Sequence, residues 1–167
     1  GVVPEMIWVK SRDNAKSWAV YNKSIHAAGN ILFLNNSNAG SGSGGFQDFQ
    51  SPSATTFNVD TSDLTNESGW RYIAYLFATL DGISKVGSYT GNGSSQTIDC
   101  GFSAGARFVL IKRTNSTGNW MLFDTTQGIV AGNDPYVYLG STAAQVTNED
   151  AVDPHSSGFI INQTNGD

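Results

Sequence analysis

The run MIWVK at residues 6–10 returns as FVLIK at residues 108–112, displaced by 108 − 6 = 102 residues without a gap. Both runs are short, apolar and partly β-branched. Turn-forming residues follow each of them, and a second apolar run then begins at Trp18 in one case and at Trp120 in the other. Short apolar runs on either side of a turn are typical of β-hairpins. We therefore predict two hairpins of the same kind, one in each half of the chain.

The similarity between the two halves continues beyond these hairpins. Residues 34–39 resemble residues 139–144 at an offset of 105, and residues 57–60 align with residues 159–162 at an offset of 102. Three blocks that recur in the same order indicate an internal repeat. The chain is therefore expected to contain two diverged copies of one unit.

We assign residues 1–83 to the first copy and residues 84–167 to the second. The first copy has no counterpart before it of residues 89–100, so it lacks its first strands. The second copy has no counterpart after it of residues 70–77, so it lacks its last strand. That strand is expected to follow Asp167 in a longer polypeptide or to come from another chain.

The rest of the chain reads as an all-β protein, because helical periodicity is nearly absent and short strand-like runs alternate with turn residues. The longest run, residues 69–77, is apolar on both faces, and we place it at the centre of a sheet. This pattern favours an antiparallel β-sandwich of lectin or jelly-roll type. Further strands are predicted at residues 31–34, 55–59, 85–90 and 97–100.

Composition excludes several classes of partner. Charged residues make up 14% of the chain, the net charge is −5, and the 9 Lys and Arg residues form no cluster. Binding to phosphates needs clustered cations, so neither nucleic acid nor an anionic membrane surface is expected as a partner. No apolar stretch reaches the ~18 residues of a membrane span, so membrane insertion is not expected. The uncharged polar surface suits a secreted or virion protein.

Several segments together resemble a repeated domain of tailed-bacteriophage virion proteins, which are described as tail-fibre or structural proteins. The most specific of them is the run SYTGNG at residues 88–93, followed by the run IKR at residues 111–113. The resemblance implies a virion or extracellular location, other virion proteins as partners, and a homo-oligomer. The segments that carry it are residues 4–12, 69–75, 85–93, 101–102 and 108–113.

A module of this kind could act as a receptor-binding part that recognises glycans on the host surface. Sugar rings stack on exposed aromatic faces, so aromatic residues in or near loops are the candidates for ligand binding. Trp18 and Trp120 occupy equivalent strand positions and are expected in the core instead. The alternative function is that of a capsid decoration protein, which would bind capsid protein through an apolar patch. The ligand-binding candidates are Trp70, Tyr89, Tyr136 and Tyr138.

Enzymatic activity is not expected. A carbohydrate-active enzyme, the less favoured alternative, would need two converging carboxylates. Most acidic residues here fall in predicted turns, and the repeat replaces Asp13 by Asn115 and Asp60 by Asn162. Turns tolerate an exchange of Asp for Asn, whereas acid catalysis does not.

Metal and cysteine chemistry have few candidates. Glu149, Asp150 and Asp153 form an oxygen-rich loop that would suit Ca²⁺, although the ligand spacing of a dedicated calcium loop is absent. Cys100 is the single cysteine, and His26 and His155 stand at positions that are not equivalent in the two copies. No other cofactor is predicted.

Overall fold

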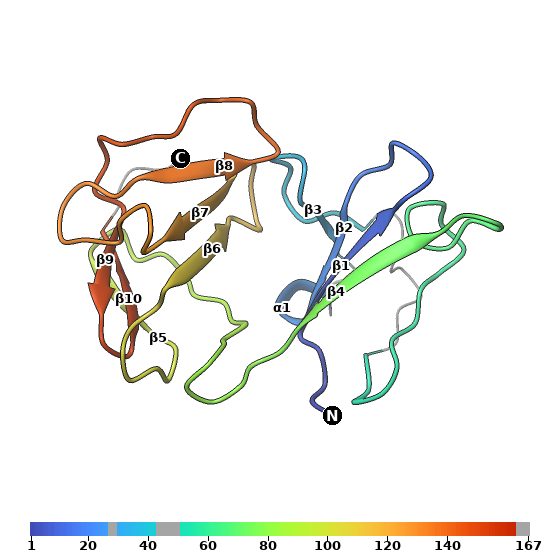
Figure 1. The fold of residues 1–167 in the computed structure, drawn as a ribbon, viewed down its shortest axis with the longest axis horizontal. Coiled ribbons are helices and arrows are strands. Elements are labelled where there is room, and N and C mark those ends of the chain that lie inside the picture. Colours follow the sequence, from blue (N-terminus) through green and yellow to red (C-terminus); the bar gives the residue numbers. More distant parts are fainter. Residues whose placement is uncertain (27–29, 43–50, 163–167) are drawn as a thin grey trace. The chain divides into compact units, whose positions relative to one another are not determined.

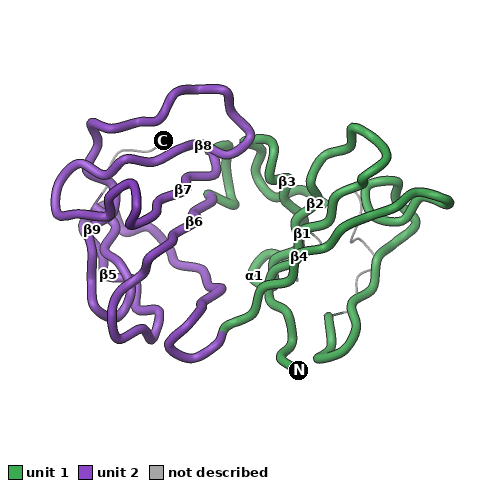
Figure 2. The backbone as a smooth tube through the Cα atoms, in the orientation of Figure 1, with its two compact units in different colours: residues 1–79, 113–118 green, residues 80–112, 119–167 purple. Residues whose placement is uncertain are grey.

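The structure is a computed structural model that describes residues 1–26, 30–42 and 51–162. Its described part is mostly β, with three small antiparallel sheets and no closed barrel (Figure 1). The chain forms two compact units, which Figure 2 distinguishes by colour. Unit 1 comprises Gly1–Thr79 and Arg113–Gly118, and unit 2 comprises Leu80–Lys112 and Asn119–Asp167. No helix among the described residues is long and apolar enough to cross a membrane.

Unit 1 contains one four-stranded sheet in the order β3-β2-β1-β4. The predicted hairpin is present as β1 and β2, which pair antiparallel, and the short helix α1 follows β2. The elements are β1 (Met6–Ser11), β2 (Ala19–Asn22), α1 (Lys23–His26), β3 (Leu32–Phe33) and β4 (Tyr72–Phe77).

The core of unit 1 lies on one face of this sheet. Side chains of β1 alternate between buried and half-buried, and Ile7 and Val9 point into the core. Residues 55–59 were expected to form a strand, but they adopt no regular structure. Phe57 and Val59 nevertheless pack against the core. The apolar pattern of residues 55–59 therefore predicted burial correctly, but the backbone of this segment is a loop rather than a strand.

β4 occupies the edge of the sheet, which corrects the prediction of a central strand. It pairs with β1 alone among the described strands. On the face opposite the core, Ile73 is 39% exposed and Tyr75 is 44% exposed. The sequence pattern is apolar on both faces in two cases: a strand buried on both faces, and an edge strand whose outer face carries aromatic residues. The pattern alone does not distinguish them.

Unit 2 contains two three-stranded sheets, in the orders β6-β7-β8 and β5-β10-β9. The second predicted hairpin is present as β6 and β7. Residues 85–90 were predicted as a strand, but they form none. The strands are β5 (Gln96–Asp99), β6 (Phe108–Lys112), β7 (Trp120–Asp124), β8 (Tyr136–Leu139), β9 (Val152–His155) and β10 (Gly158–Ile161).

Side chains from both sheets of unit 2 share one core. Phe123 and Tyr136 come from the first sheet, while Val152 and Phe159 come from the second. Gly158 is required where the strands come closest, because a Cβ atom there would lie 2.1 Å from the carbonyl oxygen of Ile98.

The two hairpins share their register. Each β1–β2 pair becomes a β6–β7 pair when 102 is added to both residue numbers, as Ile7↔Tyr21 becomes Val109↔Phe123. Pairs of β2 with β3 become pairs of β7 with β8 when 102 and 105 are added respectively. The hairpins differ at one edge: β4 pairs with β1, whereas β6 pairs only with β7 in the described part of the chain.

Candidate functional site

Four aromatic rings of unit 1 stand in succession on the face of the sheet opposite the core. Trp8 lies across from Tyr75, and Met6 lies across from Phe77, in the pairing of β1 with β4. Directly opposed residues of antiparallel strands point to the same face, so these rings gather on one side. We call Trp18, Tyr75, Trp8 and Phe77 the aromatic row.

Neighbouring rings of the aromatic row lie at the centroid distances typical of aromatic pairs. Trp8 and Phe77 have ring centroids 4.6 Å apart, and Trp8 and Tyr75 have theirs 6.5 Å apart. Trp18 stacks on Tyr75 with a centroid distance of 6.1 Å and an interplanar angle of 28°. Such pairs contribute about 0.5–1.5 kcal/mol each beyond their buried area. The row is therefore a mutually supported surface rather than a set of mobile side chains.

The polar groups of the row include two, on Trp8 and Tyr75, that have no hydrogen-bond partner among the residues that the structure describes. One is the indole Nε1–H of Trp8, which is buried. The other is the hydroxyl of Tyr75, whose side chain is 44% exposed. Tyr and Trp combine an apolar face with a polar atom, which is the combination that a ligand with both ring faces and hydroxyls requires.

The sequence prediction missed this row because it placed both repeated tryptophans in the core. Trp120 is indeed 4% exposed, but Trp18 is only half-buried and lies against Tyr75. The signal that could have revealed the row was present: residues 71, 73, 75 and 77 alternate onto one face of the longest predicted strand.

The structure does not bring the four predicted ligand-binding residues together. Trp70 lies two residues before β4 in unit 1, with Lys16 Nζ 5.8 Å from its ring centroid. Tyr89 lies in an irregular segment of unit 2, is 39% exposed, and has a hydroxyl whose pKa is raised by partial burial. Each is a single aromatic side chain outside the aromatic row.

Tyr136 and Tyr138 do lie together, in the core of unit 2. Their hydroxyl oxygens are 3.2 Å apart, and Tyr136 donates to Glu149 Oε2 at 2.7 Å. The ring of Tyr136 packs on Phe123 and is fully buried, so it offers no face for stacking. Burial, with these hydrogen bonds, raises the pKa of the Tyr136 hydroxyl well above its usual value.

The loop considered for Ca²⁺ has its oxygens engaged within the protein. The Nδ2 group of Asn162 donates to Asp150 at 3.0 Å and to Asp153 at 2.7 Å, while Glu149 accepts from Tyr136. In the described ranges, no group of three or more His, Cys, Asp or Glu side chains is arranged to hold a metal ion. Asp150 and Asp153 thus hold the residue that follows β10, and Glu149 holds Tyr136 of β8.

Other carboxylates hold backbone groups. Asp124 accepts from the N–H groups of Thr126 and Gln127 at 2.7 and 3.0 Å, and the Gln127 hydrogen bond is the main cause that lowers the pKa of Asp124. Asp134 is fully buried and accepts from two backbone N–H groups, those of Val130 and Val152. Asp124 therefore caps the turn that follows it, and Asp134 connects its loop to β9 by hydrogen bonds.

Within the residues that the structure describes, the Cys100 thiol lies against the carbonyl oxygen of Ile98, at 3.8 Å, rather than against a histidine. Burial raises the pKa of the Cys100 thiol, which disfavours the reactive thiolate. The ring of His26 packs on Tyr21 at a centroid distance of 4.9 Å, whereas His155 Nδ1 lies 3.1 Å from Ser157 Oγ.

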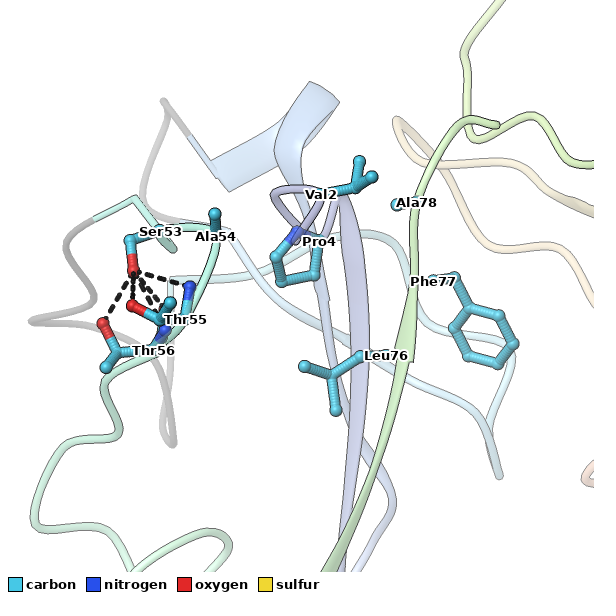
Figure 3. A pocket seen from close by; sticks show the side chains of 9 residues that line it. All are labelled: Val2, Pro4, Ser53, Ala54, Thr55, Thr56, Leu76, Phe77 and Ala78. Atoms are coloured by element: carbon cyan, nitrogen blue, oxygen red, sulfur yellow. Dashed lines mark hydrogen bonds between the residues drawn. The ribbon is translucent and has the colours of Figure 1, made fainter. Parts of the chain in front are cut away.

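A small hollow of about 170 Å³ lies beside β4 in unit 1 (Figure 3). Val2, Pro4 and Leu76 form its apolar side. On the other side, the Ser53 hydroxyl is engaged in hydrogen bonds within its own turn, and the ring of Phe77 points away. Ligand pockets usually measure about 300–1,000 Å³, so this hollow is too small for a whole sugar ring with its substituents.

Comparison with known proteins identifies a family but no function. A family model described as a domain of unknown function (DUF7483) matches residues 1–167. No curated protein and no solved structure matches the chain. What the chain does must therefore be inferred from its own residues.

Proposed function

The chain belongs to the DUF7483 family over residues 1–167, and we propose that it is a binding module of a phage virion rather than an enzyme. It would be part of a tail fibre or similar appendage and would recognise glycans on the host surface without covalent chemistry. The virion location, the association with other virion proteins and the homo-oligomeric state rest on the sequence resemblance described above.

We further propose that the chain consists of two diverged repeats with a sandwich-like core. The common register of the two hairpins supports the repeat, because the offset of 102 residues holds for every pair of β1 with β2. The core of unit 2, which is shared by two sheets, supports the sandwich. Several copies of one module in an appendage would add avidity to weak individual sites.

The aromatic row carries the proposal of glycan binding. A sugar presents apolar C–H faces and a rim of hydroxyls, so it needs aromatic faces beside hydrogen-bonding atoms. Tyr75 supplies the most exposed ring of the row and a hydroxyl without a partner in the described residues. Trp18 and Trp8 flank it, which gives a row long enough for more than one sugar ring.

The test is binding of the whole chain to a glycan array, followed by calorimetric titration with each glycan that binds. Tyr75→Ala should weaken binding by roughly 2- to 10-fold, the equivalent of one aromatic contact, and Tyr75→Phe should show how much the hydroxyl adds. Tyr89→Ala removes an aromatic ring of similar exposure outside the row and serves as the matched control.

The outcomes separate the possible sites. Loss of binding on Tyr75→Ala but not on Tyr89→Ala supports the aromatic row. The reverse result moves the site to Tyr89 in unit 2. A folded chain that binds no glycan on the array overturns the proposed recognition and leaves a structural role.

One observation favours capsid decoration as the second candidate function. Val2 and Leu76 are 54% and 50% exposed, and both line the hollow beside β4. Neighbouring exposed apolar side chains suit contact with another protein. A decoration protein would cosediment with capsids in many copies, and Leu76→Ser would reduce its occupancy while leaving glycan binding unchanged.

A further inference from the structure

A second and larger hollow lies entirely in unit 2. Its volume is about 650 Å³, within the range of ligand pockets, and three chain segments line it. The segments are residues 104–107, the loop after β7, and the end of β9 with the turn that follows it. The lining residues include Arg107, Thr125, Ile129, Pro154, His155 and Ser156.

Backbone hydrogen bonds tie these three segments to one another. Gly105 N–H donates to the carbonyl of Ser156 at 2.7 Å, and Thr125 N–H donates to the carbonyl of Arg107 at 3.0 Å. Gly105 has a φ of +78°, and a Cβ atom there would lie 2.9 Å from the carbonyl oxygen of His155. The walls are therefore held in place before any ligand arrives, which lowers the entropic cost of binding.

The charge of the hollow differs from that of the protein. The chain carries a net charge of −5, yet no Asp or Glu lines this hollow, and Arg107 does. Arg107 is exposed, and the structure records no ion pair or side-chain hydrogen bond for it among the described residues. Asp124 and Asp153 directly precede the lining residues Thr125 and Pro154, and they form hydrogen bonds with Gln127 and Asn162 rather than ion pairs with Arg107.

At the corresponding position of unit 1, the charged side chain has its partners within the protein. Glu5 stands 107 − 5 = 102 residues before Arg107, and its carbonyl accepts from Lys23 N–H just as that of Arg107 accepts from Thr125. The Glu5 carboxylate forms an ion pair with Lys23 and accepts from Thr79 N–H at 2.9 Å. The negative charge of Glu5 is thus neutralised within unit 1. In unit 2, the equivalent residue is the positively charged Arg107, which lines the hollow.

Neutral donors and apolar groups complete the lining. Ser157 N–H donates to His155 Nδ1 at 3.3 Å, so this ring nitrogen is engaged within the turn. The hydroxyls of Thr125 and Ser156 have no hydrogen bond in the described part of the chain. Ile129 and Pro154 add apolar surface. Such a lining matches a small ring with hydroxyl groups and one anionic group.

We propose that this hollow binds an anionic molecule of the size of one sugar ring, with a carboxylate or phosphate group on Arg107. The guanidinium is suited to this because its fork of N–H donors matches two oxygens of either anion. The site is independent of the aromatic row: it lies in unit 2 and recognises charge, whereas the row lies in unit 1 and recognises ring faces.

The experiment is calorimetric titration of the whole chain with glucuronate, glucose 6-phosphate, glucose and inorganic phosphate. At least one of the two anionic sugars should bind, and Arg107→Ala should weaken that binding by about 10-fold or more. Arg12→Ala removes the same charge from an exposed turn of unit 1 and should change the affinity less than about 2-fold. Circular dichroism of both variants checks that they fold.

The preference between glucuronate and glucose 6-phosphate identifies the anionic group. In amide chemical-shift maps, the signals of Thr125, His155 and Ser156 should move with the bound ligand. Equal binding of glucose would overturn the charge requirement, and equal binding of inorganic phosphate would overturn the ring. The site itself would be overturned if neither anionic sugar binds, or if Arg107→Ala and Arg12→Ala weaken binding equally.

Discussion

Asp13 and Arg71, 58 positions apart in the chain, close the end of the pairing between β1 and β4. The carboxylate of Asp13 accepts the backbone N–H of Arg71 at 2.6 Å and its Nη2 at 2.6 Å. These side-chain and backbone hydrogen bonds lower the pKa of Asp13 below its ordinary value of 3.8. Asp13, which lies in the turn of the first hairpin, thus also holds the start of the edge strand β4 in place; we call this contact the clamp.

This clamp predicts a pH dependence. Because the folded pKa of Asp13 is lowered, its contribution to stability is present above the unfolded value of 3.8 and is lost as the pH falls through the folded value. Asp13→Asn should therefore lose less stability than the wild type on acidification from pH 4 to pH 2. Thermal unfolding midpoints measured across this range check it.

Asp81→Asn provides the control for this pH experiment, because it removes the same charge from an exposed turn. If Asp13→Asn and the wild type lose stability in parallel below pH 4, Asp13 does not clamp the edge strand.

The hydroxyl pair in the core of unit 2 predicts unequal effects of two similar substitutions. Tyr136→Phe leaves Glu149 without its buried donor and should lower the free energy of unfolding by about 1.5–3 kcal/mol. Tyr138→Phe keeps that donor and should cost less, about 1 kcal/mol. Urea unfolding of the three proteins gives the values, and equal costs would contradict this account of the network.

The close approach of β5 and β10 predicts that Gly158→Ala is strongly destabilising. The added methyl would lie 2.1 Å from the carbonyl oxygen of Ile98, so the two strands must separate, at a cost of about 3 kcal/mol. Gly91→Ala is the matched control, because no atom lies within 4 Å of its Cβ position. A melting temperature of Gly158→Ala as high as that of Gly91→Ala would show that the strands can move apart freely.

The sequence alone predicted the hairpins well because their signal is local. An apolar run, a turn and a second apolar run determine β1–β2 and β6–β7, and the same offset of 102 residues appears in the strand pairing. Segments whose burial comes from tertiary packing were harder to predict. Phe57 and Val59 are apolar and alternate, but they pack from a loop, and only the three-dimensional structure distinguishes this from a strand.

The candidate sites were harder to predict than the strands for a related reason. Equivalent positions of a repeat suggest equivalent environments, yet Trp120 is buried while Trp18 lies in the aromatic row. The hollow in unit 2 depends on Arg107, a single cation in a chain without basic clusters. Its significance appears only when its neighbours and its counterpart Glu5 are known.

The loop between β6 and β7 belongs to unit 1, where Gly40 N–H donates to the carbonyl of Thr114 and Gly118 N–H donates to that of Ser37. This has a consequence for synthesis on the ribosome. The last residues of unit 1 emerge only after β5 and β6, so unit 1 cannot complete its contacts before unit 2 is partly translated. Unit 1 therefore completes its fold late in synthesis, although its own core residues all precede residue 80.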